Sequence, residues 1–181
     1  MKSEASDSQV DSSAFDRSDF ALAIALAGIA GIVILPGLGA QSLANWDEAI
    51  YGVGTRELLA DLSLTLHYGG RPWFEKPPFA FWLMAASSSL FGLTEFALRL
   101  PSAFFGITAV VLQYLAGRNL GGRPAGLLAA LLLLGAPQFV AYSRLAMTDV
   151  PLAGLGMLSV VLLLYAKGRS SLIMAAGGAF G

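Results

Sequence analysis

The stretch Phe20–Asn45, FALAIALAGIAGIVILPGLGAQSLAN, contains no ionisable side chain. As an α-helix, a stretch of this length can cross the roughly 30 Å hydrocarbon layer of a bilayer. Further uncharged runs follow at 77–94, 100–117, 124–143, 150–166 and 170–181. Only 13% of the residues are charged and the mean hydropathy is positive, which is not the composition of a soluble globular protein. We therefore predict an all-α integral membrane protein, a multi-span helical bundle.

The composition also excludes some classes of site and partner. The chain has no cysteine, so disulfides and thiolate metal sites are excluded, and its net charge of −1 argues against a nucleic-acid partner. The first nineteen residues are rich in Ser and Asp and do not form the basic start of a cleavable signal. We predict a disordered cytoplasmic tail at 1–19. Residues 20–181 are expected to be the N-terminal part of a longer transmembrane domain, since the last apolar run stops early.

The run Pro77–Thr94 permits two topologies. Its length allows a span, whereas its Ser87-Ser88-Ser89 sequence and its aromatic cluster suit a helix at the membrane surface. Only the surface alternative leaves two basic loops on the cytoplasmic side, where such loops are favoured; they contain Arg118 and Arg123, and Lys167 and Arg169. We adopt it, with spans at about 20–39, 99–117, 124–142 and 151–166 and a fifth from Ser170. Gly121-Gly122 should separate two spans, and Pro137 should kink one.

This topology brings most remaining charges to one non-cytoplasmic side, in a first outer loop at about 40–98 and in the link before Pro151. Apolar residues at helical spacing from Trp46 to Leu66 predict a helix that lies on the membrane. Asn45 could cap this helix and place Asp47 and Glu48 in its first turn, where the helix dipole favours negative charge. The acidic pair could therefore be a catalytic feature or only a stabilised helix start.

Further charges also have two interpretations. In Glu75-Lys76-Pro77-Pro78 the prolines hold the preceding ion pair in a defined direction, so that Lys76 could meet a lipid phosphate or only snorkel to ordinary headgroups. Asp149 could be a second outer acid or only a cap for the next helix. Each of three arginines could bind a phosphate or only anchor the end of a helix: Arg56, Arg99 and Arg144.

Four segments resemble, in order and spacing, the membrane glycosyltransferases with the GT-C fold that use polyprenyl-phosphate sugars. They are WDEAIY at 46–51, EKPP at 75–78, RLPSA at 99–103 and SRLAMTD at 143–149. The most similar types are the bacterial aminoarabinose transferases and the protein O-mannosyltransferases. The former often carry Arg where this chain has Ile50, and the latter carry His where it has Glu75. The resemblance covers about Phe20 to the end, which corresponds to the first third of such an enzyme.

The resemblance implies transfer of one sugar, with inversion, from a polyprenyl phosphate to a glycolipid, protein or other glycan. The expected place is the periplasmic face of a bacterial inner membrane. The catalytic carboxylates would be Asp47, Glu48 and Asp149, with Asp47 the principal one. A segment with these residues but without the rest of the enzyme is expected to be inactive. The alternative is a non-catalytic membrane scaffold or a transporter fragment, although transporters favour ionisable groups within their spans.

The resemblance also implies how the lipid-linked phosphate is held. Lys76 would contact it, Tyr51 and Arg56 would line the same cavity, and Arg144 could add a further cation. Glu75 could share a divalent metal ion with a histidine beyond Gly181, and no nucleotide cofactor is expected. The expected partners are thus the polyprenyl-phosphate-linked sugar, the lipid bilayer and the acceptor.

Overall fold

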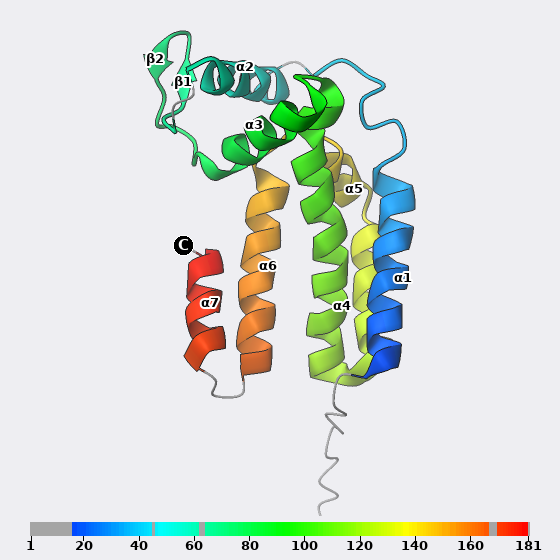
Figure 1. The fold of residues 1–181 in the computed structure, drawn as a ribbon. Coiled ribbons are helices and arrows are strands. Elements are labelled where there is room, and N and C mark those ends of the chain that lie inside the picture. The colour runs from blue at the N-terminus through cyan, green and yellow to red at the C-terminus, as the bar shows by residue number, and fades with distance from the viewer. Residues whose placement is uncertain (1–15, 45, 62–63, 167–169, 181) are drawn as a thin grey trace, which may run out of the picture.

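The structure is a computed structural model that describes residues 16–44, 46–61, 64–166 and 170–180. Its elements are α1 (Arg17–Ile34), α2 (Asp47–Asp61), β1 (His67–Tyr68), β2 (Arg71–Pro72), α3 (Phe79–Phe91), α4 (Glu95–Leu134), α5 (Pro137–Ser143), α6 (Asp149–Ala166) and α7 (Ser170–Phe180). The predicted helical bundle is confirmed. Figure 1 shows α1, α4, α6 and α7 side by side, with α2, the two strands and α3 together at one end, which we call the loop end.

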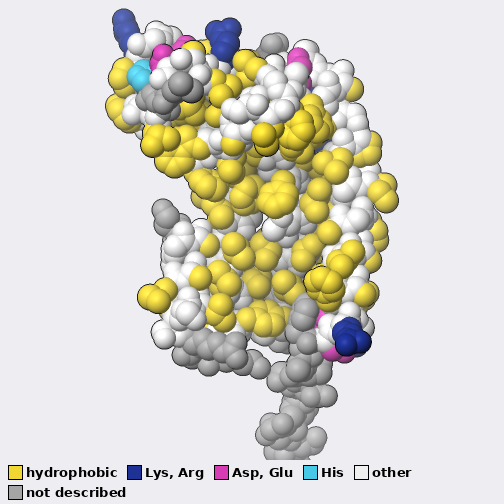
Figure 2. Space-filling view, in the orientation of Figure 1, with side chains coloured by type: hydrophobic (Ala, Val, Ile, Leu, Met, Phe, Trp, Pro, Cys, Tyr) yellow, Lys and Arg dark blue, Asp and Glu magenta, His cyan; other side chains and the backbone are white. Residues whose placement is uncertain are grey.

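The surface of the bundle has the polarity of a membrane protein. Helices α1, α4 and α6 are long and apolar enough to cross a membrane. Figure 2 shows hydrophobic side chains over the sides of the bundle and charged side chains near its two ends. Apolar sides suit contact with lipid tails, and charged ends suit contact with headgroups and water.

Helix α1 begins earlier than expected. Asp16 is its N-cap and forms a capping box with Asp19, so Arg17–Asp19, which we assigned to the tail, form the first turn. The rest of the predicted tail, 1–15, lies outside the described residues. The helix ends at Ile34, before the predicted Gly39, because Pro36 has no N–H to continue it.

Helix α4 contains two passes. Gly121 and Gly122 have non-helical backbone angles, and the φ of 77° at Gly122 is one that glycine adopts readily. The chain reverses there, as predicted, and its two halves pack closely. A Cβ on Gly126 would lie 2.6 Å from the carbonyl oxygen of Tyr114. Glycine at this position therefore allows the two backbones to meet.

Two other segments show how proline and helix length shape the bundle. Pro137 does not kink a continuous span: α4 ends at Leu134, and α5 starts at Pro137, because the ring would clash with the preceding turn. Pro77–Thr94 forms α3, whose 13 residues extend about 20 Å as a helix, less than the hydrocarbon thickness. It lies at the loop end beside α2, an arrangement that favours the surface alternative (Figure 1).

A small core at the loop end positions the segment between β2 and α3. Tyr51, Phe81 and Trp73 pack against one another, with the Tyr51 and Phe81 ring centroids 5.2 Å apart. The hairpin turns at Gly69-Gly70, where both φ values are positive, and both of these amides donate to the carboxylate of Glu57, at 3.0 and 3.2 Å. The hairpin is thereby fixed to α2, and so is the start of the Glu75–Pro78 segment.

Candidate functional site

Glu48 is enclosed by hydrogen-bond donors. Its side chain is 2% exposed, and Arg99 donates to it from Nε at 2.7 Å and from Nη2 at 2.9 Å. The backbone amides of Ala44 and Ala146 also donate to it, at 2.6 and 2.7 Å. Burial by itself raises the pKa of Glu48, but the bonds from Arg99 and the two amides outweigh it and lower the pKa below its ordinary value. Glu48 is thus an ionised, fully engaged carboxylate.

Arg99 extends this contact to more of the chain. Its Nη1 donates to the carbonyl oxygens of Leu38 and Gln41, both at 2.8 Å, and its Nη2 donates to that of Ser42 at 3.0 Å. One buried ion pair therefore joins the α1–α2 linker, α2, α4 and the link between α5 and α6. The contacts of Glu48 are those of a structural residue, whereas the resemblance implied a catalytic carboxylate at this position.

Arg144 also has a structural place. Its Nη1 and Nη2 donate to the carbonyl oxygens of Ile34 and Pro36, at 2.6 and 2.8 Å. These acceptors lie at the end of α1, where carbonyls have no partner within the helix. Of the two interpretations from the sequence, the contacts favour the anchor of a helix end over the phosphate ligand.

Lys76 lies among three of the expected site residues. Its Nζ is 5.6 Å from the centroid of the Tyr51 ring. Hydrogen bonding to the Tyr51 hydroxyl is the main effect that raises the pKa of Lys76, and the carboxylate charges of Asp47 and Asp149 raise it further. Tyr51 is itself 1% exposed and held in the aromatic core. We call Asp47, Tyr51, Lys76 and Asp149 the charge cluster.

Both acids of the charge cluster are in the first turn of a helix. Asp47 starts α2 and Asp149 starts α6. The carbonyl of Thr148 accepts the first helical hydrogen bond of α6, which places Thr148 and not Asp149 at the N-cap. Asp149 is exposed and Asp47 half-buried, and among the described residues neither forms an ion pair within 4.0 Å. Both carboxylates are therefore accessible to a ligand.

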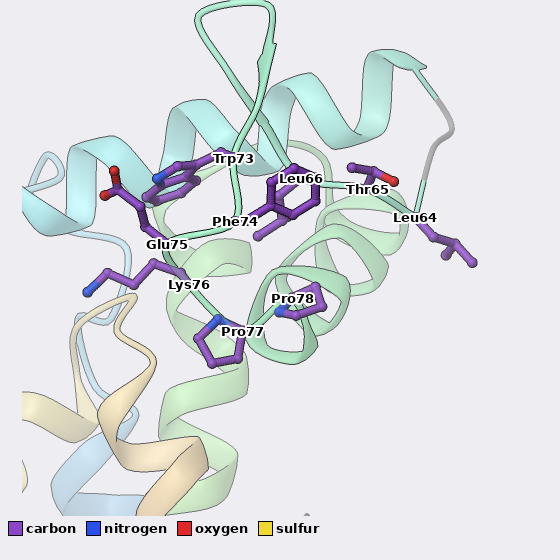
Figure 3. A pocket seen from close by; sticks show the side chains of 9 residues that line it. All are labelled: Leu64, Thr65, Leu66, Trp73, Phe74, Glu75, Lys76, Pro77 and Pro78. Atoms are coloured by element: carbon purple, nitrogen blue, oxygen red, sulfur yellow. The ribbon is translucent and has the colours of Figure 1, made fainter.

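Glu75 lies apart from the charge of its neighbour. None of the ion pairs in the described part of the chain joins it to Lys76, contrary to the ion pair that we expected. Figure 3 shows its carboxylate beside Trp73, while Lys76 extends separately. Within the described residues, no group of three His, Asp or Glu side chains could hold a metal ion. Glu75 alone does not make a metal site, and metal binding stays a prediction.

Two hollows meet at Pro77-Pro78. The first, about 540 Å³, lies between Leu64–Leu66 and Trp73–Pro78 (Figure 3). The second, about 590 Å³, lies between α3, α6 and α7 and is mostly apolar. It is lined by Pro77, Pro78, Phe79, Ala80, Trp82, Thr148, Pro151, Leu152, Leu155, Gly178 and Ala179. Lys76 directly precedes Pro77, and Asp149 directly follows Thr148, both of which line this second hollow. The charged residues therefore adjoin an apolar hollow.

Arg56 does not join the charge cluster. It follows Tyr51 by five positions, which on a helix places it about 140° away around the axis. Its exposed side chain lines a separate hollow of about 250 Å³ together with Thr94 and Glu95. The resemblance implied that Arg56 lines the same cavity as Lys76. The structure instead places Arg56 in a separate hollow.

A second buried ionic cluster lies at the opposite end of the bundle. Asp19 is fully buried and accepts hydrogen bonds from the Tyr114 hydroxyl at 2.9 Å, from Arg118 Nε at 2.6 Å and from Arg123 Nε at 2.9 Å. It links the start of α1 to both halves of α4. From the sequence, Arg118 and Arg123 are expected only as charges of a cytoplasmic loop. The sequence signal for this cluster is the position of Asp19, an acidic residue directly before the long apolar run that begins at Phe20.

The sequence is similar to a known family and to several known proteins. The family described as dolichyl-phosphate-mannose-protein mannosyltransferase matches residues 75–181. An uncharacterized protein of Aquifex aeolicus is 31% identical over 63% of this chain. Two proteins named undecaprenyl phosphate-alpha-4-amino-4-deoxy-L-arabinose arabinosyl transferase are also similar. That of Pseudomonas savastanoi pv. phaseolicola is 33% identical over 66% of this chain, and that of Sodalis glossinidius is 38% identical over 56%.

Solved structures show the same fold. Crystal structures of ArnT from Cupriavidus metallidurans, bound to undecaprenyl phosphate and in the apo state, match with TM-scores of 0.79 and 0.74 at 27% identity. They cover 88% and 90% of this chain, but the match spans only 31% and 30% of theirs. The matched part is likewise 19–23% of the sequence relatives. The chain thus corresponds to less than a third of these proteins.

Proposed function

Because the chain belongs to the dolichyl-phosphate-mannose-protein mannosyltransferase family, we propose that it supplies one wall of the active site of a membrane glycosyltransferase with a polyprenyl-phosphate-sugar donor. The observation that carries the proposal is the charge cluster, in which three separate segments contribute Asp47, Lys76 and Asp149. The segment would act as the N-terminal part of a larger transferase, since its relatives are several times longer. By itself it is expected to be inactive.

The donor would lie across the boundary between Lys76 and the hollow between α3, α6 and α7. The ammonium group would bind the phosphate, and the apolar walls would receive the first isoprenyl units. A lysine is protonated at neutral pH, as phosphate binding needs, and the surroundings of Lys76 raise its pKa further. The similar ArnT structure contains undecaprenyl phosphate, which supports a lipid phosphate as the ligand class.

In this proposal the residues take part in the reaction as follows. The acceptor oxygen would attack the anomeric carbon on the face opposite the phosphate, and the bond from that carbon to the phosphate oxygen would break with inversion. The electron pair leaves with the phosphate, where Lys76 stabilises the negative charge. Asp47 would take the proton of an acceptor hydroxyl. If the acceptor is itself a phosphate, no base is needed and Asp47 would orient it, with Asp149 beside it.

The remaining candidates take supporting roles in this proposal. Glu48 would position Asp47 and the link to Asp149 through its bonds to Arg99 and Ala146, without touching the substrate. Arg144 would hold the end of α1. No step is assigned to Arg56, to Glu75 or to a metal ion.

The loop end would face the periplasm of a bacterial inner membrane. The support is the placement of Arg118 and Arg123 at the opposite end of the bundle, because basic residues near span ends favour the cytoplasmic side. The acceptor, a glycolipid, a protein or another glycan, would then be modified outside the cytoplasm.

Replacement of Asp47 tests the catalytic role. In the full-length protein in proteoliposomes, we expect Asp47→Asn to reduce transfer of labelled sugar from its polyprenyl phosphate by about 10²–10⁴-fold, the usual effect of a lost general base. Asp61→Asn, which changes an exposed acid at the other end of the same helix, should retain activity. Near-normal turnover of a well-expressed Asp47→Asn variant would reject this role.

A further inference from the structure

Trp46, the residue before Asp47, has an unusual backbone conformation. Its φ of 81° is the only positive φ at a non-glycine position in the described part of the chain. Large side chains rarely adopt this region, because the Cβ atom crowds the backbone. Such strain persists where the surrounding structure or a function selects it.

Trp46 is also an unusual start for a helix. The amide of Ile50 donates to its carbonyl oxygen at 3.0 Å, so Trp46 is at the N-cap of α2. Residues with a side-chain oxygen are favoured there because they accept bonds from the free amides of the first turn. The indole has no acceptor for those amides. The predicted cap, Asn45, lies outside the described residues.

The ring of Trp46 takes little part in packing. It is 82% exposed, whereas Trp73 packs in the aromatic core and Trp82 donates from Nε1 to the Leu64 carbonyl. Within the described residues, none of the aromatic ring contacts involves Trp46. Backbone strain, a poor cap and an exposed indole therefore coincide at one residue. Violations of several local rules at one position are expected at functional sites.

We propose that the Trp46 indole is a stacking platform for a sugar ring of the acceptor, next to the carboxylate of Asp47. This inference rests on the proposed function. An exposed indole presents a flat apolar face, which suits the C–H face of a sugar ring, while the sugar hydroxyls stay in water. Asp47 would take the proton of the reacting acceptor hydroxyl. The sugar ring that carries this hydroxyl would then lie within reach of Trp46, the residue next to Asp47. Trp46 would thus select a glycan or glycolipid over a protein side chain.

Membrane anchoring is the competing explanation, because tryptophan is enriched at membrane interfaces. Anchoring needs an apolar side chain at the right depth, but it requires neither a flat ring at this residue nor proximity to Asp47. Trp46→Leu keeps an apolar side chain and the strained position, and Trp46→Phe keeps a ring. Trp46→Gly removes the ring and relieves the strain. Phe91→Leu is the matched control, at an exposed aromatic residue of α3 at the same end.

The experiment uses the full-length protein in proteoliposomes, with membranes of the source organism as the acceptor and an isotope-labelled donor. Dilution of the membranes gives the apparent KM for the acceptor. We expect Trp46→Leu and Trp46→Gly to raise it about tenfold, the order of one stacking contact, while Trp46→Phe and Phe91→Leu stay within about twofold. The donor KM and the melting temperature of Trp46→Leu should not change, and the label should be attached to a sugar.

An unchanged acceptor KM in both ring-less variants, a change confined to the donor KM, or label attached to serine or threonine would overturn the proposal. Trp46→Leu keeps the test valid if Trp46→Gly fails to fold. If the proposed function itself is wrong, the unmodified protein will transfer no sugar, so the experiment distinguishes that failure from failure of the Trp46 proposal.

Discussion

Asp47 and Glu48 are adjacent in the sequence but have opposite surroundings. Asp47 is half-buried and has no ion-pair partner within 4.0 Å among the described residues, whereas Glu48 receives four hydrogen bonds from Arg99, Ala44 and Ala146. Side chains at successive helix positions point about 100° apart, so one faces the charge cluster and the other faces α4. The contrast divides the acidic pair into an accessible acid and a structural one.

The structural role of Glu48 can be measured as stability. Glu48→Gln would leave the buried guanidinium of Arg99 without its counter-charge, and we expect it to lower the free energy of unfolding by about 3–5 kcal/mol at pH 7. The change would appear in denaturant unfolding in detergent micelles. Asp61→Asn, at an exposed acid, should change stability by less than about 0.5 kcal/mol.

The lowered pKa of Glu48 adds a pH dependence to this prediction. The carboxylate contributes its full stability above its unfolded pKa, near 4.3, and loses it as the pH falls through the lower folded pKa. The difference between the unmodified protein and Glu48→Gln should therefore be constant from pH 6 to 8 and shrink below about pH 4. A variant as stable as the original at pH 7 would contradict the structural role.

At the scale of the elements, helix boundaries follow from local chemistry, and the sequence predicts most of them. Uncharged length and the Gly121-Gly122 break could be anticipated, because each depends on residues close in the chain. The short α3 could not, because the uncharged run at 77–94 is long enough to span. At Pro137 a kink and a break are both compatible with the missing N–H, and tertiary packing decides between them.

Contacts between distant residues could not be predicted in this way. Glu48 and Arg99 are 51 positions apart, and Asp19 and Arg118 are 99 apart. The sequence shows each of these charges but not its partner, because the pairing depends on how the helices pack. The predicted topology placed Asp47, Lys76 and Asp149 on one side of the membrane, but only the resemblance joined them with Tyr51 in one site. The resemblance also included Arg56, which the fold places elsewhere.

The close contact of the two halves of α4 gives an element-scale prediction. In Gly126→Ala the new Cβ would lie 2.6 Å from a backbone oxygen and 3.0 Å from the amide nitrogen of Arg118, which cannot rotate away. We expect a loss of about 1–3 kcal/mol in unfolding free energy. Gly156→Ala in α6 has no heavy atom within 4 Å of its new Cβ and should be neutral or slightly stabilising. Equal stability of the two variants would argue against the close contact.

At the scale of the whole molecule, the two ends of the bundle have different chemistry. At one end, Asp16 and Asp19 form ion pairs with Arg118 and Arg123 and hold α1 against α4. At the loop end, buried pairs such as Glu48 with Arg99 fix the backbone, while Asp47 and Asp149 stay accessible beside Lys76. The structural charges are thus paired with one another, and those proposed to act on substrate are accessible.

The most direct test asks whether Asp47 and Asp149 share one extracytoplasmic side. The chain contains no cysteine, so single cysteines can be placed at 47, at 149 and, as a control, at Leu120, which is 68% exposed near the α4 break. Each variant of the full-length protein, in an otherwise cysteine-free background, is treated in spheroplasts with a membrane-impermeant thiol reagent. Positions 47 and 149 should react without permeabilisation, and position 120 only after it. Reaction of position 149 only after permeabilisation would contradict a shared site at the outer face.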